Sequence, residues 1–174
     1  MHKNNLIIIL LGFFLSSCSS SMNAFVQTSN EGIFLQAKKG QSINLHINNP
    51  SKLNTNLEEK INKKIQNLGL VLDKNDADYE ILINIVNLKK ISYAQRLRSS
   101  SAKFFFNDFD KIDDIFDMEV ENYYIMQVNL QINSKKSSQK TSLLARTTHL
   151  GNLDNVKETL EEKISEQIAS FFYF

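Results

Sequence analysis

The chain has 174 residues, 42% of them hydrophobic, and carries 20 Lys and Arg against 19 Asp and Glu. Residues 1–17 contain Lys3 and no acid, so the part that begins at residue 18 has 19 residues of each sign and is formally neutral. A neutral domain without a long basic stripe has no electrostatic reason to bind nucleic acid, and we expect no nucleic-acid partner. The remaining length, roughly 155 residues, suits one ordinary hydrophobic core.

The N-terminus predicts export and lipidation. Lys3 is followed by the apolar run Leu6–Leu15 and two small residues. This run has the length of a signal-peptide core and is too short to span a bilayer. The junction Leu15-Ser16-Ser17-Cys18 resembles a bacterial lipobox, in which the cysteine is acylated and becomes the mature N-terminus. We therefore expect residues 1–17 to be a cleaved lipoprotein signal peptide.

Cys18 is expected to carry the lipid and to be the membrane contact of the mature protein. The alternative, a disulfide or a buried thiol, lacks support, because Cys18 is the only cysteine and is followed by three serines. Each buried methylene is worth about 0.8 kcal/mol, so several acyl chains make anchoring effectively permanent. By resemblance to bacterial sorting rules, Ser19 rather than Asp after the cysteine favours delivery to the outer membrane.

The first half of the chain predicts a tether, a strand, a helix and two more strands. Residues 18–31 are polar and are expected to be a lipidated tether, with order beginning near Gly32. Alternation at 42–48 indicates a half-buried strand. Helical spacing at 57–68 indicates an amphipathic helix, started by a capping box at 55–58 and ended at Gly69. A short strand at 70–72 precedes a longer, central strand at 79–88.

The second half predicts a hairpin and a second helix. Polar and apolar residues alternate at 120–132, and a polar connection leads to a return strand at 141–149. Apolar residues recur at helical spacing from Leu153 to Ile168, and the aromatic end at 171–174 is expected to pack on the core. The fold class predicted is α+β, with a mixed or antiparallel sheet and two amphipathic helices on one face.

Several segments resemble the TraT family of lipoproteins. The first half of the resemblance is carried by residues 43–51, the helix through Gly69, and Ala77-Asp78-Tyr79. The second half is carried by Glu119–Met126, Val128–Ile132, Leu160–Ile164 and Ile168-Ala169. The resemblance makes residues 32–174 a TraT-like domain. It implies a large homo-oligomer in the outer membrane that is associated with surface exclusion during conjugation and with complement resistance.

The chain departs from the family at about 91–118, where a charged, Phe-rich segment replaces a Gly- and Ala-rich hydrophobic one. Its apolar residues at helical spacing form a candidate interaction face, composed of Phe105, Phe109, Ile112 and Phe116. This face either packs as a flap on the core of its own domain or docks onto a neighbouring subunit or another partner. The acidic residues around it argue against adsorption to an anionic membrane.

Catalytic, metal-binding and cofactor-binding motifs are not found in the sequence. The five glycines do not form a phosphate loop or a dinucleotide fingerprint, and no Gly-x-Ser-x-Gly elbow occurs. His46 and His149 lack ligand spacing and are expected to be surface strand residues. The acid-rich run at 108–117 contains no glycine for a calcium loop and is expected to be a solvated helical face. We therefore expect no enzyme and no cofactor.

Two functions remain open at this point. The first is a non-enzymatic, TraT-like outer-membrane lipoprotein that acts by oligomeric assembly and by contact with envelope or extracellular proteins. The alternative is an accessory periplasmic lipoprotein that binds or regulates an envelope-biogenesis complex.

Overall fold

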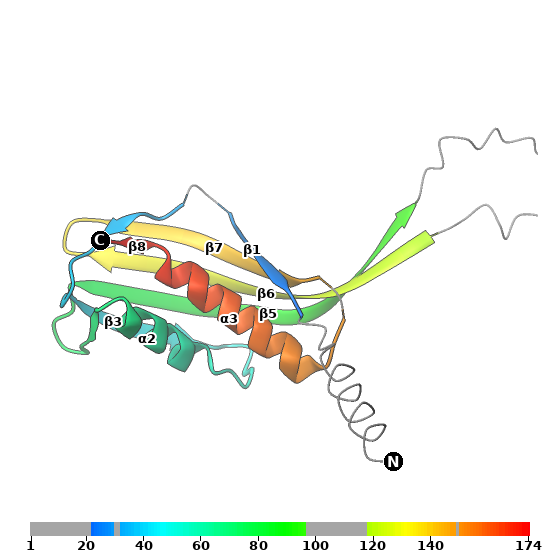
Figure 1. The fold of residues 1–174 in the computed structure, drawn as a ribbon, viewed down its shortest axis with the longest axis horizontal. Helices are drawn as coiled ribbons and strands as arrows, with labels where there is room; N and C mark the ends of the chain where they lie inside the picture. Colours follow the sequence, from blue (N-terminus) through cyan, green and yellow to red (C-terminus); the bar gives the residue numbers. More distant parts are fainter. Residues whose placement is uncertain (1–21, 30–31, 97–117, 149) are drawn as a thin grey trace, which may run out of the picture.

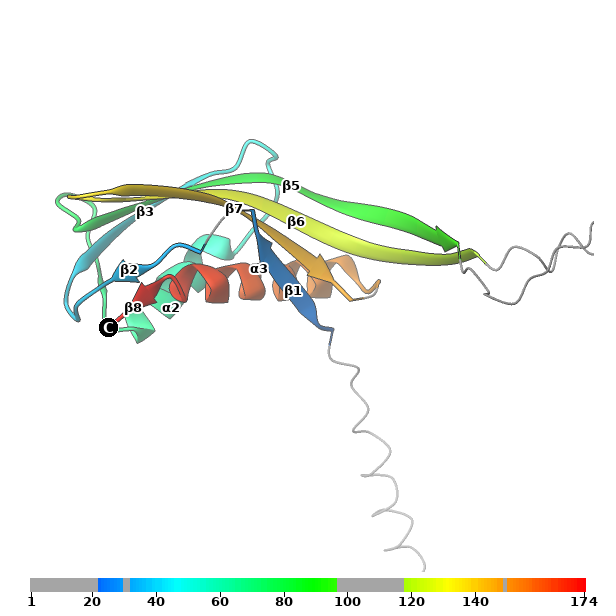
Figure 2. The same cartoon turned by 90° about the horizontal axis from the view of Figure 1, so that it is seen from above.

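The computed structural model describes residues 22–29, 32–96, 118–148 and 150–174. Within these ranges the chain forms a mixed six-stranded sheet in the order β1-β7-β6-β5-β3-β4, with both helices on one face (Figures 1 and 2). The predicted α+β class is confirmed. The elements are β1 (Ala24–Thr28), β2 (Leu35–Gln36), β3 (Ser42–Asn48), α2 (Leu57–Asn67), β4 (Val71–Leu72), β5 (Tyr79–Arg96), β6 (Met118–Ser134), β7 (Ser138–Thr147), α3 (Leu153–Ala169) and β8 (Phe172–Tyr173).

The core lies between the sheet and the two helices, because every second strand residue points to the helical side. β5 is central as predicted, parallel to β3 and antiparallel to β6. The buried strand residues include Tyr79, Ile81, Ile83, Ile85, Met126, Val128, Leu130 and Ile132. The helices contribute Leu57, Ile61, Ile65, Val156, Leu160, Ile164 and Ile168. Within the described ranges, the opposite face of the sheet carries no helix (Figure 2).

The end of α2 is as predicted, and its start is not. Gly69 has φ +84°, and the N–H groups of Gly69 and Leu70 donate to the carbonyls of Gln66 and Ile65, which is a Schellman end. At the other end, Asn56 holds the N-cap position without a side-chain cap. The predicted capping box is wrong. A carboxylate from α3 receives the hydrogen bonds there, and sequence spacing does not show this.

Order begins earlier than the predicted Gly32. β1 lies inside the range assigned to the tether and pairs antiparallel with β7, from Ala24↔Thr147 to Thr28↔Leu143. Only Ala24 of this strand is fully buried, so its apolar pattern is too weak to indicate a strand. Its hydrogen bonds to β7, about 120 residues further along the chain, supply the stabilisation.

The chain end packs on the core as expected and also pairs with β2. The N–H groups of Leu35 and Ala37 donate to the carbonyls of Phe171 and Tyr173, both at 2.8 Å. The ring of Phe172 meets Tyr79 edge-on, with centroids 5.4 Å apart. A second, two-stranded sheet, β2 with β8, therefore closes this end of the core.

The β5–β6 hairpin extends beyond the rest of the sheet as a two-stranded arm (Figure 1). β5 continues to Arg96, past the predicted end at residue 88, because it stays paired with β6 as far as Arg96↔Met118, with one register shift between Ile85 and Asn87. The flanks of the segment at about 91–118 are therefore strands, whereas residues 97–117 lie outside the described residues. No helix in the described ranges is long and apolar enough to cross a membrane.

Candidate functional site

The predicted site residues lie outside the described part of the chain. This holds for Cys18, the expected lipidation site, and for the candidate interaction face. The members of that face are Phe105, Phe109, Ile112 and Phe116, all between residues 97 and 117. Both therefore remain predictions. Of the two histidines expected on surface strands, His46 is exposed on β3, whereas His149 lies outside the described residues.

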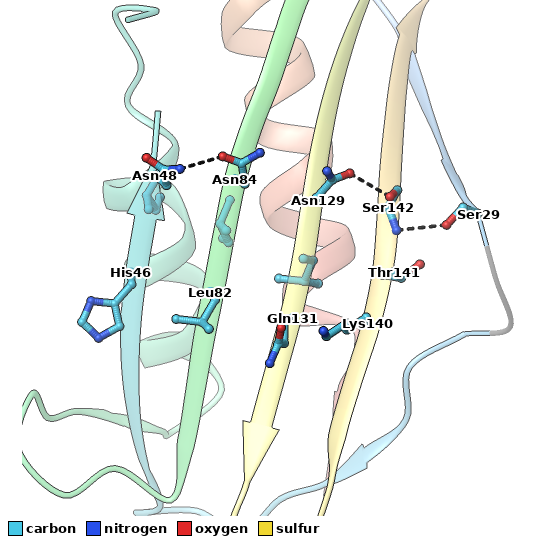
Figure 3. Close-up of a pocket in the computed structure, with 13 residues that line it drawn as sticks. Ser29, His46, Asn48, Leu82, Asn84, Asn129, Gln131, Lys140, Thr141 and Ser142 are labelled. Atoms are coloured by element: carbon cyan, nitrogen blue, oxygen red, sulfur yellow. Dashed lines mark hydrogen bonds between the residues drawn. The ribbon is translucent and has the colours of Figure 1, made fainter. Parts of the chain in front are cut away.

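A shallow groove lies on the helix-free face of the sheet (Figure 3). Its volume is about 590 Å³, and it crosses β3, β5, β6 and β7. The side chains that point into it are those that alternate with the buried core residues. They come from Ser29, His46, Asn48, Leu82, Asn84, Asn129, Gln131, Lys140 and Ser142.

A continuous row of amides and hydroxyls crosses this groove. The sheet register aligns Asn48 with Asn84, Asn84 with Asn129, and Asn129 with Ser142. Asn48 Nδ2 donates to Asn84 Oδ1 at 2.9 Å, and Ser142 Oγ donates to Asn129 Oδ1 at 2.8 Å. The Ser29 hydroxyl on the far side accepts from the Ser142 N–H at 3.0 Å. We call Asn48, Asn84, Asn129, Ser142 and Ser29 the amide row.

Asparagine is disfavoured in strands, because it packs poorly on a pleated surface and competes for backbone hydrogen bonds. Three asparagines in cross-strand register therefore do not follow from strand stability alone. The row places several donors and acceptors on a rigid sheet. Such a surface is suited to binding a polar group by hydrogen bonds.

The next row of residues along the strands contains polar and basic side chains and one apolar side chain. His46, Leu82, Gln131 and Lys140 are aligned by the same register. His46 Nε2 lies 3.8 Å from a carboxylate oxygen of Glu80, and both side chains are about half exposed, at 55% and 44%. Among the described residues there is no group of three or more His, Cys, Asp or Glu side chains that could hold a metal ion.

Further along, the same face becomes more apolar and more basic. The guanidinium of Arg146 lies 5.0 Å from the centre of the Tyr123 ring, which is cation–π geometry. Arg146 is aligned with Phe25 on β1 and with Ile125 on β6. Phe25 is 59% exposed, whereas Ile125 is buried. An exposed aromatic beside an exposed cation gives this end the composition of a contact surface.

Neither a protein-family model nor a curated protein matches the chain. Solved structures similar to it include the PelC dodecamer from Paraburkholderia phytofirmans (11% identity, 83% of this chain and 96% of that chain, TM-score 0.47). A minor lipoprotein from Acinetobacter baumannii is 13% identical over 75% of this chain and 90% of that one, with TM-score 0.43. Rare lipoprotein B from Shewanella oneidensis is 10% identical over 73% and 88%, with TM-score 0.33.

The sequence alone does not identify the amide row. Alternation along each strand shows that Asn48 and Asn129 belong to a wet face, and the prediction of a polar face on 120–132 rested on that pattern. The alignment of residues from different strands depends on register, which is fixed by long-range pairing. The row is therefore visible only in the folded sheet.

Proposed function

We propose that the protein is a lipoprotein of the bacterial envelope, anchored in the outer membrane by acylated Cys18. In this proposal it works without catalysis, by assembling with further copies and by contacting envelope or extracellular proteins. The observation that carries the proposal is the junction Leu15-Ser16-Ser17-Cys18, which places the lone cysteine directly after a signal-peptide core.

The start of the fold supports this anchoring. Ala24, the first residue of β1, comes six residues after Cys18. A fully extended chain spans at most about 3.3–3.6 Å per residue, so the first strand would lie within roughly 20 Å of the lipid. β1 is hydrogen-bonded into the sheet along β7, and the anchor would therefore hold the whole domain close to the membrane surface.

The helix-free face supports action by contact. It presents amides, hydroxyls, the cations Lys89, Lys140 and Arg146, and an exposed phenylalanine on one sheet. From the resemblance to the TraT family we further propose that the protein forms a homo-oligomer. We also propose that this oligomer takes part in surface exclusion and complement resistance. Phe105, Phe109, Ile112 and Phe116 would then be a second interaction face.

The anchor is tested with Cys18→Ala in cells fed labelled palmitate. The wild-type protein should take up the label and fractionate with the outer membrane. The variant should lose the label and either leave the membrane fraction or accumulate as an unprocessed precursor. A soluble, unlabelled wild-type protein would contradict the proposal.

Surface exposure separates the two envelope functions. Added protease or antibody that reaches the domain on intact cells supports the TraT-like function. Complete protection, lost only when the outer membrane is permeabilised, supports an accessory periplasmic lipoprotein. Native mass measurement of the mature protein in detergent tests assembly, and a monomeric mass across micromolar concentrations would contradict a homo-oligomer.

A further inference from the structure

Two amide nitrogens in the middle of the amide row point toward one another. Asn84 turns its oxygen to Asn48 and Asn129 turns its oxygen to Ser142, as their hydrogen bonds require. The Nδ2 groups of Asn84 and Asn129 therefore lie on the sides that face each other across β5 and β6 (Figure 3). Neither nitrogen donates to a protein acceptor within the described ranges.

This arrangement places two amide nitrogens side by side, while each of the two amide oxygens already accepts one hydrogen bond. Each side-chain amide carries two N–H groups, so the two nitrogens that face each other offer four N–H groups. The ligand group that fits these two nitrogens is one whose oxygen atoms accept several hydrogen bonds at once. A carboxylate is the protein group that does this best, because its two oxygens offer about four acceptor positions.

The charges on this face also favour an anion. Lys140 lies one row from Asn129 on the neighbouring strand and extends over the groove (Figure 3). Lys89 and Arg146 belong to the same face by register with Ile125. The acids that the register places on these strands of the face lie two or more rows from the amides: Glu80, whose carboxylate already accepts from Asn133 Nδ2 at 2.9 Å, and Glu119 and Glu121 far along β6. By register, Lys140 is therefore closer to the two amides than any of these acids, and the charge beside the amides is positive.

We propose that the helix-free face is a docking site for an acidic peptide segment of a partner protein, with a carboxylate held between the Nδ2 groups of Asn84 and Asn129. Lys140 supplies the attraction for further acidic side chains, and Leu82 gives apolar contact beside them. The proposal rests on the proposed function, since it names the chemistry of the protein contact made there.

The test measures binding of a peptide probe to the full-length acylated protein in neutral detergent micelles. The probe is a fluorescent hexa-aspartate peptide with blocked ends, and hexa-asparagine is its uncharged match. Fluorescence anisotropy at low salt should show hexa-aspartate binding at least about tenfold more tightly than hexa-asparagine. Binding should weaken as salt screens the charges.

Two isosteric variants test whether the side-chain N–H groups of Asn84 and Asn129 bind the carboxylate. Asn84→Asp and Asn129→Asp keep the acceptor oxygen for Asn48 and Ser142 but replace the N–H donors with negative charge. Each should weaken hexa-aspartate binding by about tenfold or more. Asn155→Asp, on α3 across the sheet, makes the same change in charge and should leave affinity unchanged. Thermal melting of each variant confirms that it is folded.

Three results would overturn the proposal. They are an absence of hexa-aspartate binding, equal loss of binding in Asn155→Asp, and competition by the neutral N-acetylglucosamine hexamer, which would indicate a glycan site. None of these results affects the labelling and fractionation of Cys18→Ala. Failure of the docking site is therefore distinguishable from failure of the envelope assignment.

Discussion

The hydroxyl of Thr55 donates a 2.7 Å hydrogen bond to the carboxylate of Glu161, a residue 106 positions later. The same carboxylate oxygen accepts from the N–H of Asn56 at 3.3 Å, and the Thr55 oxygen accepts from the N–H of Leu57 at 3.1 Å. Glu161 is completely buried in α3. The N–H at the N-cap of α2 is thus satisfied by the other helix, and the buried carboxylate lies at the positive end of the α2 dipole.

We predict that Glu161→Ala destabilises the domain by about 1–3 kcal/mol, because it leaves the Thr55 hydroxyl and the Asn56 N–H without their acceptor, whereas Lys60 keeps its ion pair with Glu158. Lys60 Nζ lies 3.6 Å from the second oxygen of Glu161. Glu161→Gln keeps one acceptor and should lose less. The measurement is the urea midpoint of unfolding.

The control for this prediction is Glu162→Ala, one residue along α3. Its carboxylate is 40% exposed and pairs with Lys64, so its loss should change stability by no more than about 1 kcal/mol. Equal effects of the two substitutions would show that the capping contact between the helices contributes little.

This contact also shows where reasoning from the sequence fails. The spacing of Thr55 and Glu58 fits a local capping box, but the carboxylate that is used belongs to Glu161 of another helix. Local patterns identify α2, Gly69 and the alternating strands because each depends on residues within a few positions of one another. Partners distant in the chain, such as Glu161, do not leave a local pattern.

Among the strands, too, local patterns identify some features and miss those that depend on distant residues. Alternation in β3, β5 and β6 is strong enough to identify the strands and their buried faces. β1 escaped detection because an edge strand with one fully buried residue has little apolar pattern. The amide row could not be predicted from the sequence, because Asn84 and Asn129 are 45 positions apart and only the pairing of β5 with β6 aligns them.

We predict that Ile61→Ala lowers the free energy of unfolding by about 2–5 kcal/mol, through lost burial and the cavity it leaves. Ile61 is completely buried on the face of α2 that packs on the sheet. Leu153→Ala is the control, because Leu153 is 53% exposed at the start of α3 and should change stability little. An unchanged urea midpoint for Ile61→Ala would mean that this face of α2 does not pack as described.

We predict that Gly69→Ala destabilises the domain by about 1–2 kcal/mol, because a side chain is strained at φ +84°. Space is a lesser factor, since the added Cβ would meet only the flexible Lys39 side chain, at 3.4 Å. Gly69→Asn should recover part of the loss, because Asn tolerates this conformation better. If alanine and asparagine lower the melting temperature equally, the backbone conformation is not the cause.

We predict that Glu166 makes stability depend on pH in the acidic range. The hydrogen bond from Lys163 Nζ, at 2.8 Å, lowers the pKa of Glu166 below its ordinary value of 4.5, and partial burial opposes the shift. A pKa that is lower in the folded state means that the stabilisation is present above pH 4.5 and is lost as pH falls through the folded value. Because the side chain is 42% exposed, solvent screens the pair and the effect is small. Melting temperatures measured between about pH 5 and pH 3 should therefore fall less steeply in Glu166→Gln than in the wild type, and high salt should reduce the difference. Identical slopes for the two proteins at low salt would show that the Lys163–Glu166 pair does not contribute to acid sensitivity.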